Sequence, residues 1–244
     1  MAHSGADGRG PRPVSWPPQT FLGMLSEDAR DELLSLGTSR EYMADQALML
    51  EGDPTTDVVA LIDGWVKIVG STEEGGQALL SLRVGGALIG EQAALDNGPR
   101  SATVISAGVT IGHVLSQHEF LRFLYRRSDA AVAVCRSLSN ELRWATRRRI
   151  DFTGPVVARL ARVLSELGRL YGQPASDGIA LQYALTQTEF AAMVGASEAS
   201  IQKALRKLRG RGVIKTGYRK VMIVDPVALN LVASSRQSSR KPVN

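Results

Sequence analysis

The stretch that decides the fold runs from Gly90 to Val104 and reads GEQAALDNGPRSATV. Gly90 has no side chain, so a ligand can approach its backbone closely, and the neighbouring Glu91 carboxylate can accept a hydrogen bond from a sugar hydroxyl. Arg100 follows nine residues later, and its planar guanidinium fork suits a phosphate with two free oxygens. Ser101 offers a hydroxyl and a backbone N–H to the same anion. The stretch therefore predicts a cradle for one phosphate and one ribose.

Short apolar runs broken by turn residues flank this cradle (residues 90–104). Strands at spacings of roughly 8–12 residues with glycine punctuation indicate a small antiparallel barrel or roll. A short helix is expected ahead of it, over residues 21–36. The runs expected to form strands are Leu48–Leu50, Val58–Ile62, Trp65–Val69, Ala78–Val84, Ala102–Ile105 and Thr110–Leu115.

Composition and length limit the class of protein. The 244 residues suffice for two domains, because a domain usually has about 100–200 residues. No run of about 18 apolar residues and no secretory signal is evident, so we expect a cytoplasmic protein that makes no membrane contact. Cys135 is the only cysteine, which excludes an internal disulfide. His113 and His118 lack the further ligands that a metal site needs, so no metal is expected.

A long helical segment follows the predicted roll. Its seam residues are spaced alternately by four and three positions, which is the pattern of one helix packing along another. The simplest partner is the same helix of a second copy, so we expect a homodimer; the alternative is a helix that covers its own roll. Gly154 and Pro155 must interrupt this helix, after three arginines at 147–149. The seam consists of Leu124, Ser128, Ala131, Cys135, Leu138, Leu142 and Ala145.

The last third of the chain carries a helix–turn–helix pattern, after a helix expected from Val157 to Tyr171. Thr186 and Glu189 have the spacing of a capping box at the start of one helix. A glycine at 195 ends that helix, and Ser197 can cap the next one. Two short helices joined by a glycine-containing turn are typical of this motif, whose second helix lies in the major groove of DNA. The apolar positions of the second helix are Ile201, Leu205 and Leu208.

Basic residues gather on the second helix and beyond it. The chain has a net charge of +5, and residues 199–224 contain no acid at all. Gln202 can pair with adenine and Lys203 can reach guanine. The alternative is a helical hairpin of an unrelated core with a solvated basic rim. The other predicted DNA contacts are Ser197, Glu198, Ser200, Arg206 and Lys207 on the helix, and Arg219 and Lys220 at the tip of a hairpin wing.

Residues 51–104 resemble the cyclic-nucleotide-binding domain. Gly-Glu at 90–91 and Pro-Arg-Ser-Ala-Thr-Val at 99–104 match that family's phosphate-binding cassette, and four glycines fall where the family places its turns. With the helix–turn–helix added, residues 20–232 resemble bacterial transcription regulators of the cyclic-AMP receptor and fumarate–nitrate regulator (Crp/Fnr) family. The glycines are Gly52, Gly64, Gly85 and Gly90.

The resemblance implies roles for the residues of the cradle. Glu91 would bind the ribose 2′-hydroxyl, while Arg100 and Ser101 would hold the cyclic phosphate. The alternative is an internal salt bridge between Glu91 and Arg100 that holds the loop in an unliganded protein. The ligand-binding set implied by the resemblance is Gly90, Glu91, Gln92, Arg100 and Ser101, with Thr146 on the long helix as the candidate for reaching adenine.

Two features depart from the best-known members of that family. Cyclic-AMP responders have hydroxyl residues on the long helix that reach the adenine, and here Thr146 is the nearest candidate. On the recognition helix, Glu198, Ala199 and Lys203 replace the usual Arg-Glu…Arg set, so the operator should differ from the family's usual palindrome. No cysteine cluster is present, which excludes the iron–sulfur oxygen-sensing branch.

Taken together, the sequence predicts an α+β protein: an antiparallel β-roll, a long dimerisation helix and a winged helix–turn–helix. We expect a homodimeric transcription regulator that binds a palindromic operator in double-stranded DNA, with a cyclic nucleotide, cyclic AMP first, as allosteric effector and with no other cofactor. RNA polymerase is a further candidate partner. The expected boundaries are 1–18 for a disordered arm, 19–120 for the roll, 121–150 for the dimerisation helix, 151–232 for the DNA-binding domain and 233–244 for a flexible tail.

Two alternatives to this function remain open. One is a ligand-independent member of the same family whose roll is only a dimer platform. The other is a nucleotide-processing enzyme with Glu91 as general base, which we do not expect because no nucleophile–base pair or metal set accompanies Glu91.

Overall fold

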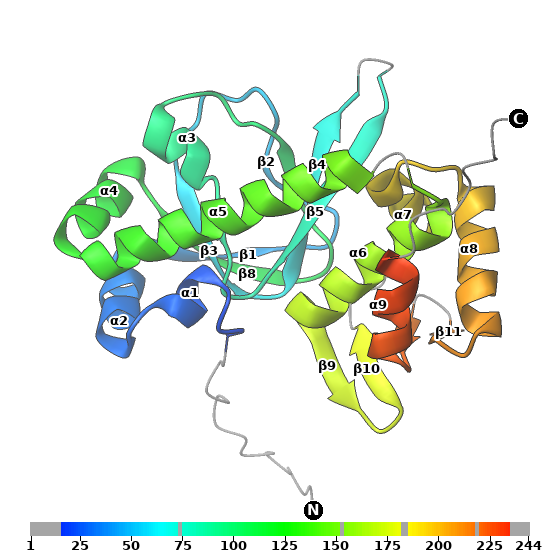
Figure 1. Cartoon of the computed structure of the whole chain (residues 1–244). Coiled ribbons are helices and arrows are strands. Elements are labelled where there is room, and N and C mark those ends of the chain that lie inside the picture. The colour runs from blue at the N-terminus through cyan, green and yellow to red at the C-terminus, as the bar shows by residue number, and fades with distance from the viewer. Residues whose placement is uncertain (1–15, 73–74, 152–153, 182–184, 218–219, 235–244) are drawn as a thin grey trace, which may run out of the picture.

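The computed structural model describes residues 16–72, 75–151, 154–181, 185–217 and 220–234, with backbone alone for residues 148–151. The expected disordered arm and flexible tail lie largely outside the described residues. Trp16, which falls within the expected arm (residues 1–18), belongs to the folded part. Its indole Nε1 donates a hydrogen bond to the backbone oxygen of Ile62 at 2.9 Å. One long helix, α5, runs along a β-roll and ends beside a winged helix–turn–helix (Figure 1).

The roll consists of two four-stranded antiparallel sheets, with strand orders β1-β8-β3-β6 and β2-β7-β4-β5. Apolar side chains of both sheets meet between them, among them Met49, Val59, Val66 and Val104. The predicted antiparallel roll is therefore confirmed. Its strands are β1 (Thr38–Tyr42), β2 (Ala47–Met49), β3 (Val58–Asp63), β4 (Trp65–Ser71), β5 (Gln77–Val84), β6 (Leu88–Ile89), β7 (Thr103–Ser106) and β8 (Thr110–Leu115).

Helices cover one side of the roll and share a second apolar core with it. The single helix expected over residues 21–36 is in fact two, because Leu25 is extended and the Ser26 side chain caps a new helix by accepting from the backbone N–H of Ala29. Phe21, Phe120 and Phe123 are fully buried in this core. The helices are α1 (Phe21–Met24), α2 (Glu27–Ser35), α4 (Gln117–Arg126) and α5 (Ser128–Asp151).

The predicted seam is correct in part. The chain leaves helical geometry at Arg127, so Leu124 belongs to α4 rather than to α5. Leu138 packs against the core of its own roll, as do Ala130, Ala133 and Val134. At about 100° per residue, the face opposite this buried one carries an exposed row. That row is Ser128, Val132, Cys135, Ser139, Leu142 and Thr146. The face left free for a partner is thus rotated from the predicted seam.

The second half folds as a winged helix–turn–helix, as predicted. Helix α5 ends at Asp151 and α6 starts after Pro155, so the break expected near Gly154 and Pro155 is present. Its sheet has the strand order β11-β12-β10-β9, of which β9 was not predicted. The elements are α6 (Val156–Tyr171), β9 (Gly172–Ala175), β10 (Gly178–Leu181), α7 (Gln187–Val194), α8 (Glu198–Gly210), β11 (Ile214–Gly217), β12 (Lys220–Ile223) and α9 (Pro226–Ser234).

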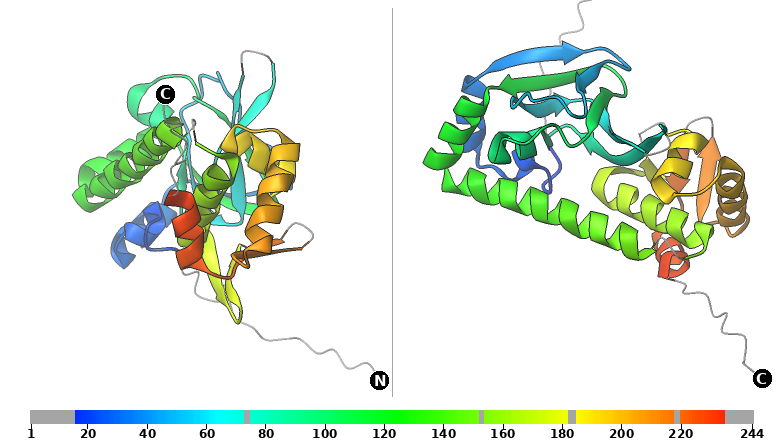
Figure 2. Two further views of the ribbon diagram at one scale, coloured as in Figure 1. Left: turned by 45° about the vertical axis from the view of Figure 1, so that its right-hand side comes forward. Right: turned by 90° about the horizontal axis from the view of Figure 1, so that it is seen from above.

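The two halves are packed against each other along the β4–β5 hairpin (Figure 2). Val69, Leu79 and Leu82 of this hairpin belong to the same apolar core as helices α6, α7 and α8. Lys67 of β4 forms an ion pair with Glu189 of α7. The Tyr171 hydroxyl donates to the backbone oxygen of Leu82 at 3.1 Å. The position of the DNA-binding half is therefore fixed by contacts with the roll as well as by α5.

Candidate nucleotide cradle and nucleic-acid interface

The cradle is built around a backbone position that only glycine fits. Gly90 follows strand β6 with φ of +82° and caps helix α3 (Glu91–Asp96). A Cβ atom at this position would lie 2.4 Å from Nη1 of Arg100 and 2.6 Å from Cε of Met49. The glycine therefore lets the Arg100 guanidinium approach the start of α3. A positive charge held there can bind an anion.

Arg100 is buried, and most of its donors are used inside the protein. Its side chain is 2% exposed. Nε donates to the hydroxyl of Thr55 at 3.0 Å, and Nη1 donates to the backbone oxygen of Gly90 at 3.0 Å. Nη2 donates to the backbone oxygen of Asp57 at 2.7 Å and to its carboxylate Oδ1 at 2.8 Å. The internal salt bridge considered for the unliganded loop thus exists, but its acid is Asp57 rather than Glu91.

Glu91 is a buried carboxylate with a raised pKa. It is 6% exposed. Burial raises its pKa, and the nearby Glu141 carboxylate raises it further, to about 7, against the lowering effect of Arg83 and Arg100. Arg83 of β5 forms an ion pair of 2.6 Å with Glu141 of α5. Glu91, the residue predicted to bind the ribose, is therefore electrostatically coupled to Glu141 of the long helix.

The structure brings five of the six predicted ligand residues together. Besides Gly90, Glu91 and Arg100, these are Ser101 and Gln92, whose side chains are joined by a hydrogen bond of 3.1 Å from the serine hydroxyl to the amide oxygen. The sixth, Thr146, is exposed. It lies about 140° around α5 from Glu141, the residue that faces the roll. Within one chain, Thr146 therefore points away from the cradle.

The helix–turn–helix forms as its caps predicted. The Thr186 hydroxyl accepts from the backbone N–H of Glu189, whose carboxylate accepts from the N–H of Thr186, which completes the capping box. Gly195 ends α7 with φ of +63°, and the Ser197 hydroxyl caps α8. Helices α7 and α8 are further joined by a 2.6 Å hydrogen bond from the hydroxyl of Thr188 to the carboxylate of Glu198.

The outer face of α8 presents polar and basic groups. Gln202, Lys203, Arg206 and Lys207 are all exposed, while Ile201, Leu205 and Leu208 are buried as predicted. A groove lined in part by Gln202, Arg206 and Lys220 runs between α7, α8 and the strands of the wing. Of the wing tip, Lys220 is exposed, and Arg219 lies outside the described residues.

Two serines predicted to contact phosphate have a structural role. The Ser197 hydroxyl accepts from the backbone N–H of Ser200 at 3.3 Å, and the two hydroxyls lie 3.0 Å apart. These bonds stabilise the first turn of α8. Both serine hydroxyls lie at the N-terminal end of α8, so Ser197 and Ser200 remain candidates for contact with DNA.

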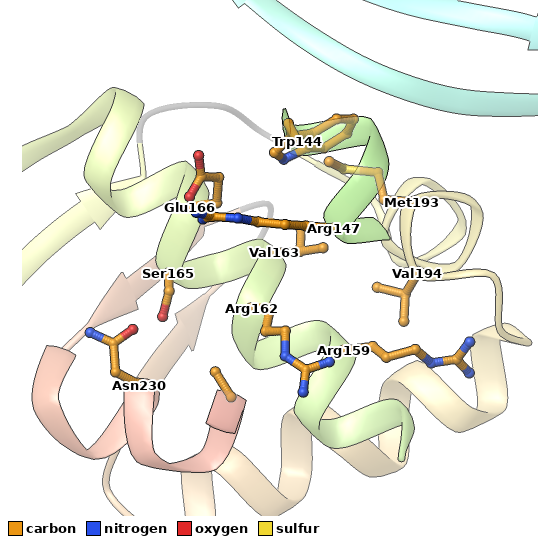
Figure 3. A pocket seen from close by; sticks show the side chains of 11 residues that line it. Trp144, Arg147, Arg159, Arg162, Val163, Ser165, Glu166, Met193, Val194 and Asn230 are labelled. Atoms are coloured by element: carbon orange, nitrogen blue, oxygen red, sulfur yellow. The ribbon is translucent and has the colours of Figure 1, made fainter. Parts of the chain in front are cut away.

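A pocket separates the end of α5 from the DNA-binding half (Figure 3). Its volume is about 210 Å³. Trp144 and Arg147 line it from α5, and Arg162 and Glu166 line it from α6. Trp144 also packs against the apolar core of the DNA-binding half, so α5 contacts that half at the rim of the pocket.

Several residues that shape the cradle were not found from the sequence. Asp57 and Thr55 hold Arg100 from a loop more than 40 positions away, and no local pattern indicates this pairing. The pair of Arg83 with Glu141 is equally remote in sequence. The ion pair of Lys67 with Glu189 was missed because Glu189 was interpreted only as a capping residue.

The described residues contain no group of three or more His, Cys, Asp or Glu side chains that could hold a metal ion. Among the helices of the described chain, none has the length and apolar character needed to cross a membrane.

Two protein-family models match the chain. The model described as cyclic nucleotide-binding domain matches residues 39–127, and the one described as Crp-like helix-turn-helix domain matches residues 158–232. The first range includes the cradle, and the second includes α7 and α8.

Relatives of known role are similar over most of their length. The CRP-like cAMP-activated global transcriptional regulator of Mycobacterium tuberculosis is 26% identical over 76% of this chain and 83% of its own. The cyclic AMP receptor protein of Thermus thermophilus is 26% identical over 87% of this chain and 95% of its own. The solved structure of FixK2 from Bradyrhizobium japonicum has the same fold, with a TM-score of 0.71 at 16% identity, covering 82% of this chain and 98% of that one.

These matches agree with the site that the structure shows. The model of the cyclic nucleotide-binding domain covers the roll with its cradle, and the Crp-like model covers the DNA-binding half. The relatives are transcription regulators rather than enzymes. The chain belongs to the Crp/Fnr family of DNA-binding transcription regulators.

Proposed function

We propose that this protein is a homodimeric transcription regulator whose affinity for its operator is controlled by a cyclic nucleotide bound in the cradle. The observation that carries the proposal is the buried Arg100, placed beside Gly90 and the start of α3. A cyclic phosphodiester has one negative charge, which this guanidinium can neutralise. Charge-assisted hydrogen bonds contribute about 1.5–3 kcal/mol each. Two or three of them, with stacking of the base, suffice for micromolar affinity, which corresponds to about −8 kcal/mol.

The named ligand residues have separate roles in this proposal. Glu91 accepts from the ribose 2′-hydroxyl, while Arg100 and Ser101 donate to the phosphate. Gly90 and Gln92 line the same site. Thr146 is exposed on the free face of α5, so it serves the effector of the partner protomer once two α5 helices pack along that face. Cyclic AMP is the first candidate effector, supported by one relative named as cAMP-activated and another named as a cyclic AMP receptor protein.

Dimerisation uses the free face of α5. Val132 and Leu142 are 48% and 69% exposed there, although both are apolar. Two copies related by a two-fold axis place two α8 helices on one side of the dimer. Productive binding needs these helices about 34 Å apart, one turn of DNA. A change in the angle between α5 and α6, beside the pocket of Figure 3, alters that spacing.

The exposed side chains of α8 are proposed to make two kinds of contact with DNA, to base edges and to phosphates. Gln202 and Lys203, with Glu198, read base edges, while Arg206, Lys207 and the wing residue Lys220 bind phosphates. Ser197 and Ser200 add contacts at the start of the helix, and Arg219 is proposed from its sequence alone.

Selection of bound DNA from a random pool, with and without cyclic AMP or cyclic GMP, tests the whole proposal. A two-fold symmetric site that is enriched more strongly with one nucleotide is the expected result. Calorimetry then compares the natural protein with Arg100→Leu, which should lose the heat of nucleotide binding. Absence of salt-sensitive, sequence-selective DNA binding under every condition would contradict it.

One observation favours a second candidate, a regulator that needs no effector. Arg100 already has an internal carboxylate as partner in this structure. In that case, the selected DNA site and its affinity would be the same with and without nucleotide, and calorimetry would give no heat.

A further inference from the structure

Four hydrogen bonds engage the Arg100 guanidinium. Nε donates to Thr55, Nη1 donates to Gly90, and Nη2 donates to both the backbone oxygen and the carboxylate of Asp57. A guanidinium has five N–H groups, so these bonds leave one N–H, on Nη1. A bidentate phosphate contact needs two donors on one edge. At least one of the present partners must therefore leave before an effector can bind in this way.

Burial decides which partner can leave. The Asp57 side chain is 41% exposed, whereas that of Arg100 is 2% exposed. Thr55 is exposed as well. The side chains of Asp57 and Thr55 can rotate into solvent, where water replaces their bonds to Arg100. The buried guanidinium cannot move out without breaking its other contacts. The mobile partner of this ion pair is the acid.

The backbone keeps Arg100 in place when its acid leaves. The backbone N–H of Arg100 donates to the oxygen of Asp53 at 2.9 Å, and its oxygen accepts from the N–H of Gly52 at 2.9 Å. These two bonds attach the loop of residues 50–57 to the cradle independently of the Asp57 carboxylate. When that carboxylate is released, these bonds still hold the Arg100 backbone, and the bond from Nη1 to the backbone oxygen of Gly90 still holds its side chain.

We propose that Asp57 is a built-in competitor of the effector: its carboxylate holds Arg100 in the unliganded protein, and the phosphate of the effector replaces it. The proposal rests on the proposed function, since it names how that same site is regulated. One negative charge leaves Arg100 and one arrives, so the guanidinium is neutralised in both states. Asp57 thereby weakens effector affinity and keeps the cradle folded without ligand.

The test compares Asp57→Asn with a matched control, Asp53→Asn. Both variants remove one charge from the same loop, but the Asp53 carboxylate is not among the partners of the Arg100 side chain. A neutral amide oxygen accepts a weaker hydrogen bond than a carboxylate. Calorimetry should show that Asp57→Asn binds the preferred cyclic nucleotide about tenfold or more tightly than the natural protein, which is the low end for one charge-assisted bond. Asp53→Asn should bind as the natural protein does.

Equal or weaker binding by Asp57→Asn than by the natural protein overturns the inference. A second variant, Asp57→Ser, guards against a local fault of the asparagine, and circular dichroism establishes that both variants are folded. Gain of affinity in Asp53→Asn as large as in Asp57→Asn also overturns it, because the effect would then be one of net charge alone.

Inorganic phosphate separates failure of the inference from failure of the proposed function. If no cyclic nucleotide binds any variant, the proposed effector is wrong, and thermal unfolding in phosphate buffer decides the inference instead. A larger phosphate-induced rise in melting temperature for Asp57→Asn than for Asp53→Asn, abolished by adding Arg100→Leu, supports exchange of anions at Arg100. Equal rises overturn it.

Discussion

Arg100 in the cradle and Arg206 on α8 are both arginines proposed to bind phosphate, yet their surroundings are opposite. Arg100 is buried and its guanidinium donates to Thr55, Gly90 and Asp57. Arg206 is exposed. Among the ion pairs of the described residues, none involves Arg206 or its neighbours Lys203 and Lys207.

The difference shows where rearrangement is needed. The basic face of α8 is ready for DNA without any internal bond being broken, so its contribution to binding is electrostatic and sensitive to salt. The cradle must first exchange one internal acceptor for a phosphate oxygen. In the proposed function, control by an effector would act on the end of the molecule that changes its hydrogen-bond partners, while the DNA-binding end would keep its local structure.

The largest expected effect is a loss of DNA affinity when cations of α8 are removed. Replacing both cations in Lys203→Ala/Arg206→Ala should weaken operator binding about thirtyfold to several hundredfold, because each lost phosphate or base contact costs about 1–2 kcal/mol. The salt dependence should also become less steep. Fluorescence anisotropy at several salt concentrations measures both. Arg122→Ala, which removes an exposed cation of α4, serves as control. The same slope in the double variant as in the natural protein would show that Arg206 makes no phosphate contact.

Arg100→Lys sharpens the comparison at the buried end. A lysine keeps the charge but lacks the planar fork, so it cannot hold two phosphate oxygens while bonding to Gly90. Calorimetry should show at least about tenfold weaker nucleotide binding, the value of one charge-assisted hydrogen bond. Arg206→Lys on α8 should change DNA affinity much less, because an exposed phosphate contact requires charge more than geometry. Equal losses at both sites would abolish the distinction drawn between them.

Glu91→Gln tests the buried carboxylate through pH. The folded-state pKa is raised from 4.5 to about 7, so the folded protein holds a proton that the unfolded chain has lost. Stability of the natural protein should then fall as the pH rises from about 4.5 to 7. Glutamine loses no proton, so the variant should be more stable than the natural protein by about 1–3 kcal/mol at pH 8 and similar to it at pH 4. Urea unfolding at both pH values measures this.

Glu51→Gln provides the control of opposite sign. Hydrogen bonds from the backbone and hydroxyl of Ser71 lower the pKa of Glu51. Its contribution is present above about pH 4.5 and is lost as the pH falls through the lowered pKa. If the stability of Glu91→Gln relative to the natural protein changes with pH in the same direction as that of Glu51→Gln, the pKa of Glu91 is not raised by burial.

The smallest expected effect is at the contact between the halves. Burial alone would raise the pKa of Glu189, but hydrogen bonds from Lys67 and from the backbone of Thr186 lower it. Lys67→Ala should cost about 1 kcal/mol of stability at neutral pH, and the difference should vanish as the pH falls below the lowered pKa. Lys215→Ala, which breaks the exposed pair with Asp177, should cost less. A loss that persists at acid pH would indicate packing rather than the ion pair.

Local signals predicted the DNA-binding half well. A cap, a left-handed glycine and an apolar period lie within a few residues of one another from Thr186 to Leu208, so each helix boundary follows from neighbours in the sequence. The position of Gly90 and Arg100 in the roll was predicted for the same reason. Asp57 could not be predicted, because it meets Arg100 across 43 residues and through the folding of two sheets. The partner face of α5 was predicted incorrectly in part, because the periodicity of apolar residues does not show which face of the helix the roll itself covers.

The apolar core that Val69, Leu79 and Leu82 share with the DNA-binding half bears on how the chain folds. These three residues lie in a hairpin of the roll, yet they are buried by helices that begin more than 70 residues later in the sequence. A fragment that ends before α6 would leave them in water and be prone to aggregate, and the winged half alone would expose the matching surface. The two halves should therefore melt as one cooperative unit, although sequence comparison treats them as separate modules.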